Sequence, residues 1–141
     1  MSVEENKALA RREMEEIFQK GNLDASEEIY APGYVAYEPT TGEIRGIEAA
    51  KQFAATYRKA FPDFQPTIED QIAEGDKVVT RFRARGTHQG ELDGIAPTGN
   101  QIEVTGITIQ RISDGRIAEE WINYDALGLM QQLGVIKQPS G

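Results

Sequence analysis

The stretch TGITIQRISDGRIAEEWINYD, residues 105–125, decides the fold. Apolar and polar side chains alternate in both of its halves, and the residues SDGR at 113–116 separate them. Alternation with a period of two is typical of a strand that buries one face, and Asp-Gly is common in tight hairpin turns. The stretch therefore predicts two antiparallel strands, at 101–112 and 116–124, joined by this turn.

Outward from this hairpin, the spacing of apolar residues changes from helical to alternating after Pro62. It predicts helices over about 3–20, 24–30 and 46–61 with a short strand at 33–39, then strands near 65–73 and 77–88, and a closing helix at 126–133. Helices followed by antiparallel strands indicate an α+β fold, here a curved sheet of four to six strands packed on N-terminal helices and enclosing one apolar pocket. We expect a single domain over residues 1–141, with a frayed tail at about 137–141.

Length, composition and charge limit the class of protein. The chain has 141 residues, 39% of them hydrophobic and 27% charged, which fits a soluble domain with one core. The formal net charge of −8 disfavours a nucleic acid partner, because phosphate backbones are also negative. The N-terminus lacks the basic start and apolar run of a signal peptide, and no apolar stretch approaches the length of a membrane span. We expect a cytoplasmic protein with no membrane partner.

The residue types exclude several kinds of catalytic site. The chain has no cysteine, and therefore no disulfide, thiolate zinc site or cysteine nucleophile. With a single histidine and no metal-binding motif, no metal site is expected. No glycine-rich phosphate loop follows a strand, so no cofactor is expected either. A small-molecule pocket is the site that the pattern favours.

His88, the single histidine, stands where a strand runs into the long loop GELDGIAPTGN. This position suits the mouth of a pocket, so His88 is a candidate ligand-binding residue. A surface histidine at a strand end is the favoured alternative, because no carboxylate adjacent in the sequence would orient its ring.

Alternation along residues 77–88 places Phe82 on the apolar face of its strand, which would line the core or the cavity. The opposite face carries three arginines. We expect these to form an ion-pair ladder rather than an anion site, with acidic partners on neighbouring strands: Arg81, Arg83 and Arg85 against Glu103 and Glu119.

Phenols and one glutamate are the other polar candidates. Four phenols offer donors for a ligand oxygen, although buried tyrosines are more often core residues: Tyr34, Tyr37, Tyr57 and Tyr124. Glu120 lies two residues before Ile122 and shares its face. A carboxyl group in a hydrophobic cavity has a raised pKa and can act as a general base. A glutamate in water at the cavity rim is the favoured alternative.

Three segments, in order and spacing, resemble the SnoaL-like polyketide cyclases (ester cyclases) of the NTF2-like superfamily: NKALARREMEEIFQKGNLD, AFPDFQPTIEDQIAEGDKVVTRFRARGTHQGELDGIAPTGNQIEVTGI and ISDGRIAEEWINYDALGLMQQLG. The resemblance covers most of the chain. It implies a cone-shaped α+β barrel around an apolar cavity, assembled as a homodimer or homotetramer. It also implies cofactor-free ring closure by an intramolecular aldol reaction, in which a carboxylate removes a proton from a carbon acid.

The same resemblance locates the family's acid/base pair on residues that cannot act as one. The family's carboxylate comes just after the last tryptophan, which is Ile122 here, and its histidine partner corresponds to Thr108. A histidine that many relatives carry near the end of the first strand corresponds to Tyr37. A bulge within residues 121–125 would turn Asn123 inward instead, and an asparagine is not a base either.

Two hypotheses stay open. One is a cofactor-independent enzyme of cyclase or isomerase type that acts on a small hydrophobic, oxygen-bearing ligand, with Glu120 as the catalytic group and Thr108 or Tyr37 as hydrogen-bond donor. The other is a non-catalytic binding module that has lost the histidine and aspartate. In both, the expected ligand-binding residues are Tyr37, Phe82, His88, Thr108, Ile122 and Tyr124. A structural or interaction domain whose cavity is simply core is a third, less specific alternative.

Overall fold

The computed structural model describes residues 1–137, so residues 138–141 of the expected frayed tail lie outside the described residues. The helical segments are α1 (Val3–Arg12), the π-helical η1 (Glu13–Gln19), the 3₁₀ turn η2 (Leu23–Ala25), α2 (Ser26–Ile29), α3 (Ile47–Ala60) and α4 (Ala126–Gln132). The strands are β1 (Tyr30–Glu38), β2 (Gly42–Arg45), β3 (Gln65–Glu74), β4 (Lys77–Thr87), β5 (Gln101–Ser113) and β6 (Arg116–Tyr124).

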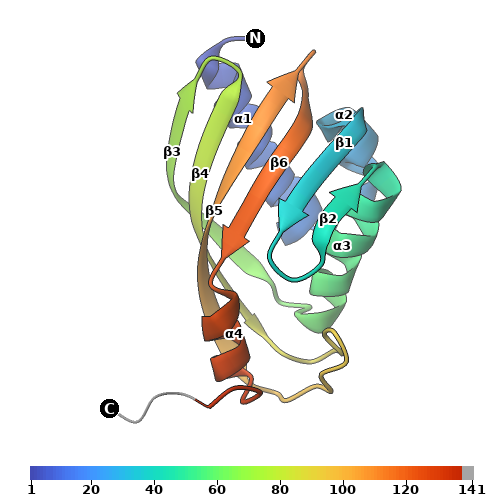
Figure 1. Cartoon of the computed structure of the whole chain (residues 1–141), viewed down its shortest axis with the longest axis vertical. Coiled ribbons are helices and arrows are strands. Elements are labelled where there is room, and N and C mark those ends of the chain that lie inside the picture. Colours follow the sequence, from blue (N-terminus) through green and yellow to red (C-terminus); the bar gives the residue numbers. More distant parts are fainter. Residues whose placement is uncertain (138–141) are drawn as a thin grey trace.

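The six strands form one sheet in the order β2-β1-β6-β5-β4-β3. The sheet is strongly curved but not closed, since β2 and β3 are its edges. In Figure 1, α1 runs along one face of the sheet, α3 lies beside β1 and β2, and α4 continues from the end of β6. The α+β architecture expected from the sequence is confirmed in this open, cone-like form.

The hairpin at 105–125 has the predicted pairing. β5 runs antiparallel to β6 from Gly106 opposite Tyr124 down to the turn. In the turn, Asp114 and Gly115 both have positive φ, 51° and 77°, as a two-residue type I′ connection requires. The pairing has no shift within residues 121–124, so the bulge that would turn Asn123 inward is not present.

Two features of the sheet differ from the expectation. β1 pairs with β6 in parallel, so the sheet is mixed and not wholly antiparallel. Alternation identifies the buried face of a strand but not its direction, which explains the difference. In addition, residues 40–46, which join the expected strand at 33–39 to the next helix and were expected as a loop, contain β2. The only buried side chain of β2 is Ile44. One buried side chain on a short edge strand leaves too little periodicity to be recognised.

The first helix also departs from the expected regular helix over residues 3–20. After Arg12 it widens into the π-helical η1, at whose end the Lys20 N–H donates to the Glu15 carbonyl at 2.9 Å. π-Helical turns are rare in proteins, and those that occur are often found at functional sites. Here the segment carries Met14 and Phe18 to the cavity described below.

The core has two apolar clusters. One packs α1, α2 and α3 against β1 and β6, and the other joins the end of α3 to β4, β5 and α4. The candidate site lies where residues at the edges of both clusters meet. Within residues 1–137, no helix is both long and apolar enough to cross a membrane.

Candidate functional site

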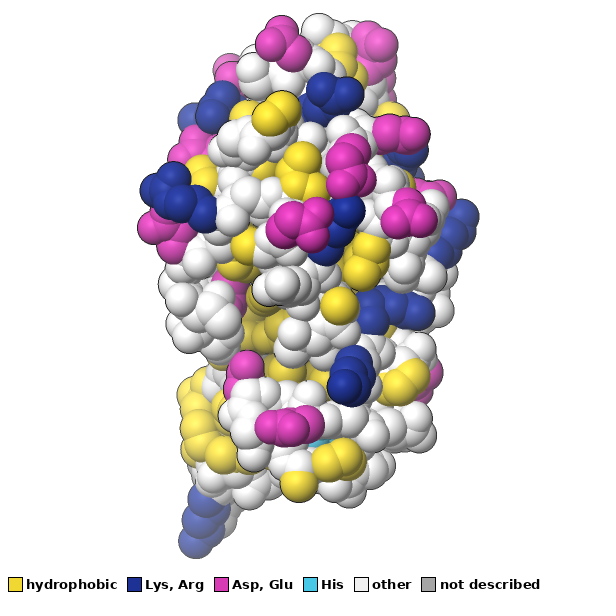
Figure 2. All heavy atoms as spheres, turned by 90° about the vertical axis from the view of Figure 1, so that its right-hand side faces the viewer, with side chains coloured by type: hydrophobic (Ala, Val, Ile, Leu, Met, Phe, Trp, Pro, Cys, Tyr) yellow, Lys and Arg dark blue, Asp and Glu magenta, His cyan; other side chains and the backbone are white. Residues whose placement is uncertain are grey.

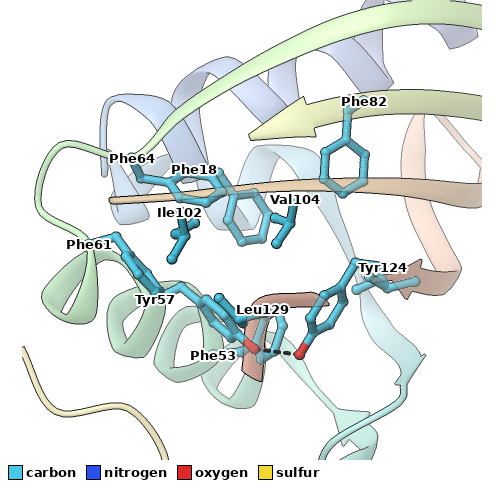
Figure 3. A pocket seen from close by; sticks show the side chains of 11 residues that line it. Phe18, Phe53, Tyr57, Phe61, Phe64, Phe82, Ile102, Val104, Tyr124 and Leu129 are labelled. Carbon is cyan, nitrogen blue, oxygen red and sulfur yellow. Dashed lines mark hydrogen bonds between the residues drawn. The ribbon is translucent and has the colours of Figure 1, made fainter. Parts of the chain in front are cut away.

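An apolar cavity lies between α3, the sheet and α4 (Figure 3). Its free volume is about 80 Å³. Figure 3 shows that its side chains converge on one centre from both sides. The lining residues are mainly aromatic and aliphatic: Phe18, Phe53, Tyr57, Phe61, Phe64, Phe82, Ile102, Val104, Ile122, Tyr124 and Leu129.

A second compartment of about 60 Å³ continues the first toward the middle of the sheet. The two share five lining side chains, Phe18, Phe53, Phe64, Phe82 and Ile122. The inner compartment adds the first polar groups, which are Glu13, Thr108 and Glu120. These three side chains form the floor of the cavity, although the surface that the inner compartment exposes is almost wholly apolar.

Glu120 lies at this floor and is 2% exposed, so the favoured expectation of a glutamate at the water-filled rim is wrong. The reason is that η1 covers this part of β6, which periodicity along β6 cannot indicate. Tyr34 of β1 donates its hydroxyl to Glu120 Oε1 at 2.7 Å. Burial raises the pKa of Glu120 well above its usual value, and the neighbouring Glu13 raises it further.

Glu13, at the start of η1, is the second buried carboxyl group and is 3% exposed. Tyr30 donates to its Oε2 at 2.7 Å, and Gln110 Nε2 donates to its Oε1 at 3.2 Å. Glu13 was not among the site residues predicted from the sequence. A signal was present, because Glu13 follows Ala10 by three residues and precedes Ile17 by four, and so lies on the apolar stripe of its helix.

Thr108 and Ile122 face each other directly across β5 and β6 and line the inner compartment. Thr108 is 5% exposed, and its Oγ1 is buried without a hydrogen-bond partner. An unpaired buried hydroxyl destabilises a fold unless a ligand or water satisfies it. Thr108 Oγ1 is therefore a candidate hydrogen-bond donor to a ligand oxygen.

The structure does not bring two of the expected ligand-binding residues to the cavity. Tyr37 is 37% exposed and stacks on Trp121 at a centroid distance of 6.2 Å. It belongs to the other face of β1, because Ala36 is buried beside it. Of the remaining tyrosines, Tyr57 and Tyr124 join α3 to β6 through their hydroxyls at 2.8 Å (Figure 3).

His88 is the other residue that lies elsewhere, and the favoured surface position is also wrong, because its side chain is fully buried. His88 Nδ1 accepts from the Thr98 backbone N–H at 3.1 Å, and the ring packs on Phe61 at 5.6 Å between centroids. The imidazole thus anchors the long loop to the end of β4 and contacts neither cavity compartment.

We expect His88→Ala to lower the free energy of unfolding by roughly 2–4 kcal/mol, because it removes a buried ring and leaves the Thr98 N–H unpaired. Affinity for a cavity ligand should stay at the wild-type value. Urea denaturation measures the first quantity and calorimetric titration the second. Loss of affinity at unchanged stability would assign His88 to the site after all.

The arginine face is an ion-pair ladder at two of the three predicted arginines, Arg83 and Arg85, whereas Arg81 forms no ion pair within residues 1–137. Arg83 Nε lies 2.9 Å from a Glu69 oxygen, and Glu103 bridges Arg83 and Arg85 at 3.1 and 3.2 Å. The expected partner Glu119 pairs with Arg111 instead, at 3.1 Å. The face turned to the viewer in Figure 2 likewise carries charges of both signs, with hydrophobic side chains in a hollow between them.

Comparison with known proteins decides the family. The family model described as SnoaL-like polyketide cyclase matches residues 8–133. The chain belongs to the SnoaL-like polyketide cyclase family. Among curated SnoaL-like relatives, the aklanonic acid methyl ester cyclase AcmA of Streptomyces galilaeus is 31% identical over 131 residues, covering 89% of this chain and 88% of AcmA. The aklanonic acid methyl ester cyclase DnrD of Streptomyces peucetius is also 31% identical, covering 87% of each chain.

Solved structures of the SnoaL-like group have the same fold. A putative SnoaL-like polyketide cyclase of Jannaschia sp. CCS1 superimposes with a TM-score of 0.88 at 27% identity, covering 97% of this chain and 95% of that one. AclR of Streptomyces galilaeus, a putative hydroxylase, gives 0.85 at 29%, covering 99% and 87%. These names cover different chemistries at similar identity, so sequence similarity alone does not assign a reaction to this chain.

Proposed function

We propose that this SnoaL-like protein binds a small hydrophobic, oxygen-bearing ligand in the cavity and catalyses a cofactor-free cyclisation or isomerisation of it, with Glu120 as the acid/base group. The observation that carries the proposal is a carboxyl group, 2% exposed, at the floor of a cavity whose walls are apolar side chains. Desolvation there raises the pKa of Glu120, which makes its carboxylate a stronger base toward a carbon acid.

Two further features support this activity. The unpartnered Thr108 hydroxyl lies in the same compartment and can donate to a carbonyl oxygen as negative charge develops on it. The relatives AcmA and DnrD are named as cyclases of aklanonic acid methyl ester, and an ester contains a carbonyl group. A folded ligand held between aromatic walls would supply the proximity that an intramolecular ring closure needs.

The size of the cavity limits the ligand. Free volumes of about 80 and 60 Å³ are well below the roughly 300–1,000 Å³ of pockets that hold drug-sized molecules. A ring system therefore enters only if some of the phenylalanine side chains rotate outward. A small ligand enters the existing space.

The alternative function is a binding module without catalysis. The observation that favours it is the apolar Ile122 at the position of the family's carboxylate, directly opposite Thr108. The two functions predict the same ligand class and differ in turnover. Ring closure of an ester-terminated poly-β-ketone, followed by mass-resolved chromatography, separates them. We expect closure faster than in buffer; binding without closure would support the module.

A matched pair of variants at Val104 tests whether the reaction occurs in the cavity. Val104 lines the apolar compartment and points toward its centre (Figure 3). We expect Val104→Phe to fill the free volume and to reduce binding and turnover at least tenfold, at a stability loss of about 1–3 kcal/mol. Val104→Ala should bind the same ligand at least as well as wild type. Equal turnover by both variants would locate the reaction outside the cavity.

A further inference from the structure

Glu13 and Glu120 form a pair of buried carboxyl groups in the inner compartment of the cavity. They come from η1 and β6, both line the inner compartment, and each is at least 97% buried. Gln110, which pairs with Glu120 across β5 and β6, donates to Glu13 Oε1 at 3.2 Å, so the two carboxyl groups lie close together. Two adjacent carboxylates cannot both be ionised in an apolar site, so the pair holds a proton between them.

The hydrogen bonds around the pair favour one arrangement of this proton. Glu13 accepts from two donors, Tyr30 and Gln110, whereas Glu120 accepts from the hydroxyl of Tyr34. Donors stabilise the ionised form of the carboxyl group that they contact. Burial and the neighbouring Glu13 raise the pKa of Glu120 more than its donors Tyr34 and Gln110 lower it, so we place the proton on Glu120.

The surroundings of the pair contain no positive charge to neutralise it. Its titratable hydrogen-bond partners are the two tyrosines of β1, Tyr30 and Tyr34, and burial raises the pKa of both. In the part of the chain that the structure describes, no lysine, arginine or histidine side chain hydrogen-bonds to either carboxyl group. Gln110 accepts in turn from Thr80 at 3.4 Å, which fixes the orientation of its amide.

A second, independent feature points to a ligand site and not only to a buried polar cluster. Thr108 Oγ1 has no partner, is in a side chain 95% buried, and lines the same compartment as both carboxyl groups. The floor thus places two carboxyl groups and an unpartnered hydroxyl beside the apolar surface of the compartment, and we expect them to turn toward a ligand that enters between the phenylalanines. This combination provides a proton acceptor and two hydrogen-bond donors at one place.

We propose that Glu13 is a catalytic partner of Glu120 in a one-proton carboxyl pair: Glu13 removes the α-proton of a carbonyl ligand while Glu120 gives its proton to the carbonyl oxygen. This rests on the proposed function. The C–H bond breaks as an O–H bond forms on Glu13, and the O–H bond of Glu120 breaks as one forms on the ligand. The ligand becomes a neutral enol and the pair keeps its single negative charge. Transfer of the proton from Glu13 to Glu120 restores the resting state.

The first test reads the shared proton without any reaction. Infrared difference spectra of the whole chain should show one protonated carboxyl group near neutral pH, where exposed carboxyl groups are ionised. The signal should be absent in Glu120→Gln. In Glu13→Gln it should titrate at a lower pH than in wild type, because the repulsion from Glu13 is gone. An unchanged titration in Glu13→Gln would overturn the pair.

The second test measures the reaction itself, as exchange of the methylene protons of ethyl acetoacetate for deuterium, followed by NMR. We expect Glu13→Gln and Glu120→Gln each to lose at least a hundredfold in exchange rate, a loss typical of a missing acid/base group of ~10²–10⁴. Glu119→Gln is the matched control, because Glu119 faces the other side of β6 and pairs with Arg111. It should keep the wild-type rate.

The outcomes separate this proposal from the proposed function. Full exchange by Glu13→Gln with none by Glu120→Gln would mean that Glu120 acts alone. This result would support the proposed function and contradict a catalytic role of Glu13. No exchange and no ring closure by wild type would remove the function and with it the catalytic role of Glu13. Thermal unfolding of each variant verifies that a lost rate is not a lost fold.

Discussion

Glu120→Gln should give a protein that is slower by ~10²–10⁴ in ring closure and yet more stable than wild type above neutral pH. The amide keeps the shape of the side chain and can still accept from Tyr34 and donate to Glu13, so ligand affinity should survive. What disappears is the ionisable proton. Rate is measured by chromatography, affinity by calorimetry and stability by thermal unfolding across a pH series.

The sign of the stability change follows from the raised pKa of Glu120. In the unfolded chain this carboxyl ionises near its ordinary value of 4.5, whereas in the folded chain it stays protonated to higher pH. Its contribution to stability is therefore fully present below pH 4.5 and is lost as the pH rises toward the folded pKa, by about 1.4 kcal/mol for each pH unit.

The variant carries no such dependence, so its advantage over wild type should be absent at about pH 4 and grow as the pH rises. Glu119→Gln, which removes a carboxylate from the opposite face, should show no growing advantage. A Glu120→Gln protein less stable than wild type at every pH would mean that the carboxyl is favourably bound as an anion in the fold. Greater stability with less activity is the usual relation at an active site that retains a costly group.

The fold could be predicted from the sequence because its signals are local. Asp114 and Gly115 specify a turn that joins two alternating runs, and their pairing then fixes which side chains of β5 and β6 share a face. Strand direction is not a local property. β1 pairs with β6 in parallel because of where the N-terminal helices place the start of β1. The periodicity of residues 30–38 carries no information about that placement.

The site was predictable only in part, for the same reason. The shared face of Glu120, Thr108 and Ile122 follows from alternation, but the depth of Glu120 depends on η1, which covers it from a distant part of the sequence. Glu13 was recognisable from its place on the apolar stripe of its helix, but its nearness to Glu120 depends on the contact between η1 and the sheet, which no local pattern indicates. His88 shows the reverse case, in which a residue of catalytic type holds a loop.

Ile122→Asp should lower the free energy of unfolding at about pH 8, by at most about 3–5 kcal/mol, the range found when a charge is left unpaired in a protein interior, because Ile122 is only partly buried. Ile122 lines the compartment of Glu13 and Glu120, so the new carboxylate would face a pair that already carries negative charge. Thr108, the residue opposite, offers a hydroxyl but no positive charge. Urea denaturation at several pH values gives the size and the pH dependence of the loss.

Ile122→Asn is the control, since it places a polar group of the same size there without a charge. Its loss should be smaller and nearly independent of pH, whereas the loss in Ile122→Asp should shrink as the aspartate becomes protonated at low pH. Equal losses at every pH would mean that the floor accepts a third carboxylate. The predicted difference would instead mean that the Glu13–Glu120 pair and a carboxylate at position 122 exclude each other, which gives a physical reason for isoleucine at the position of the family's base.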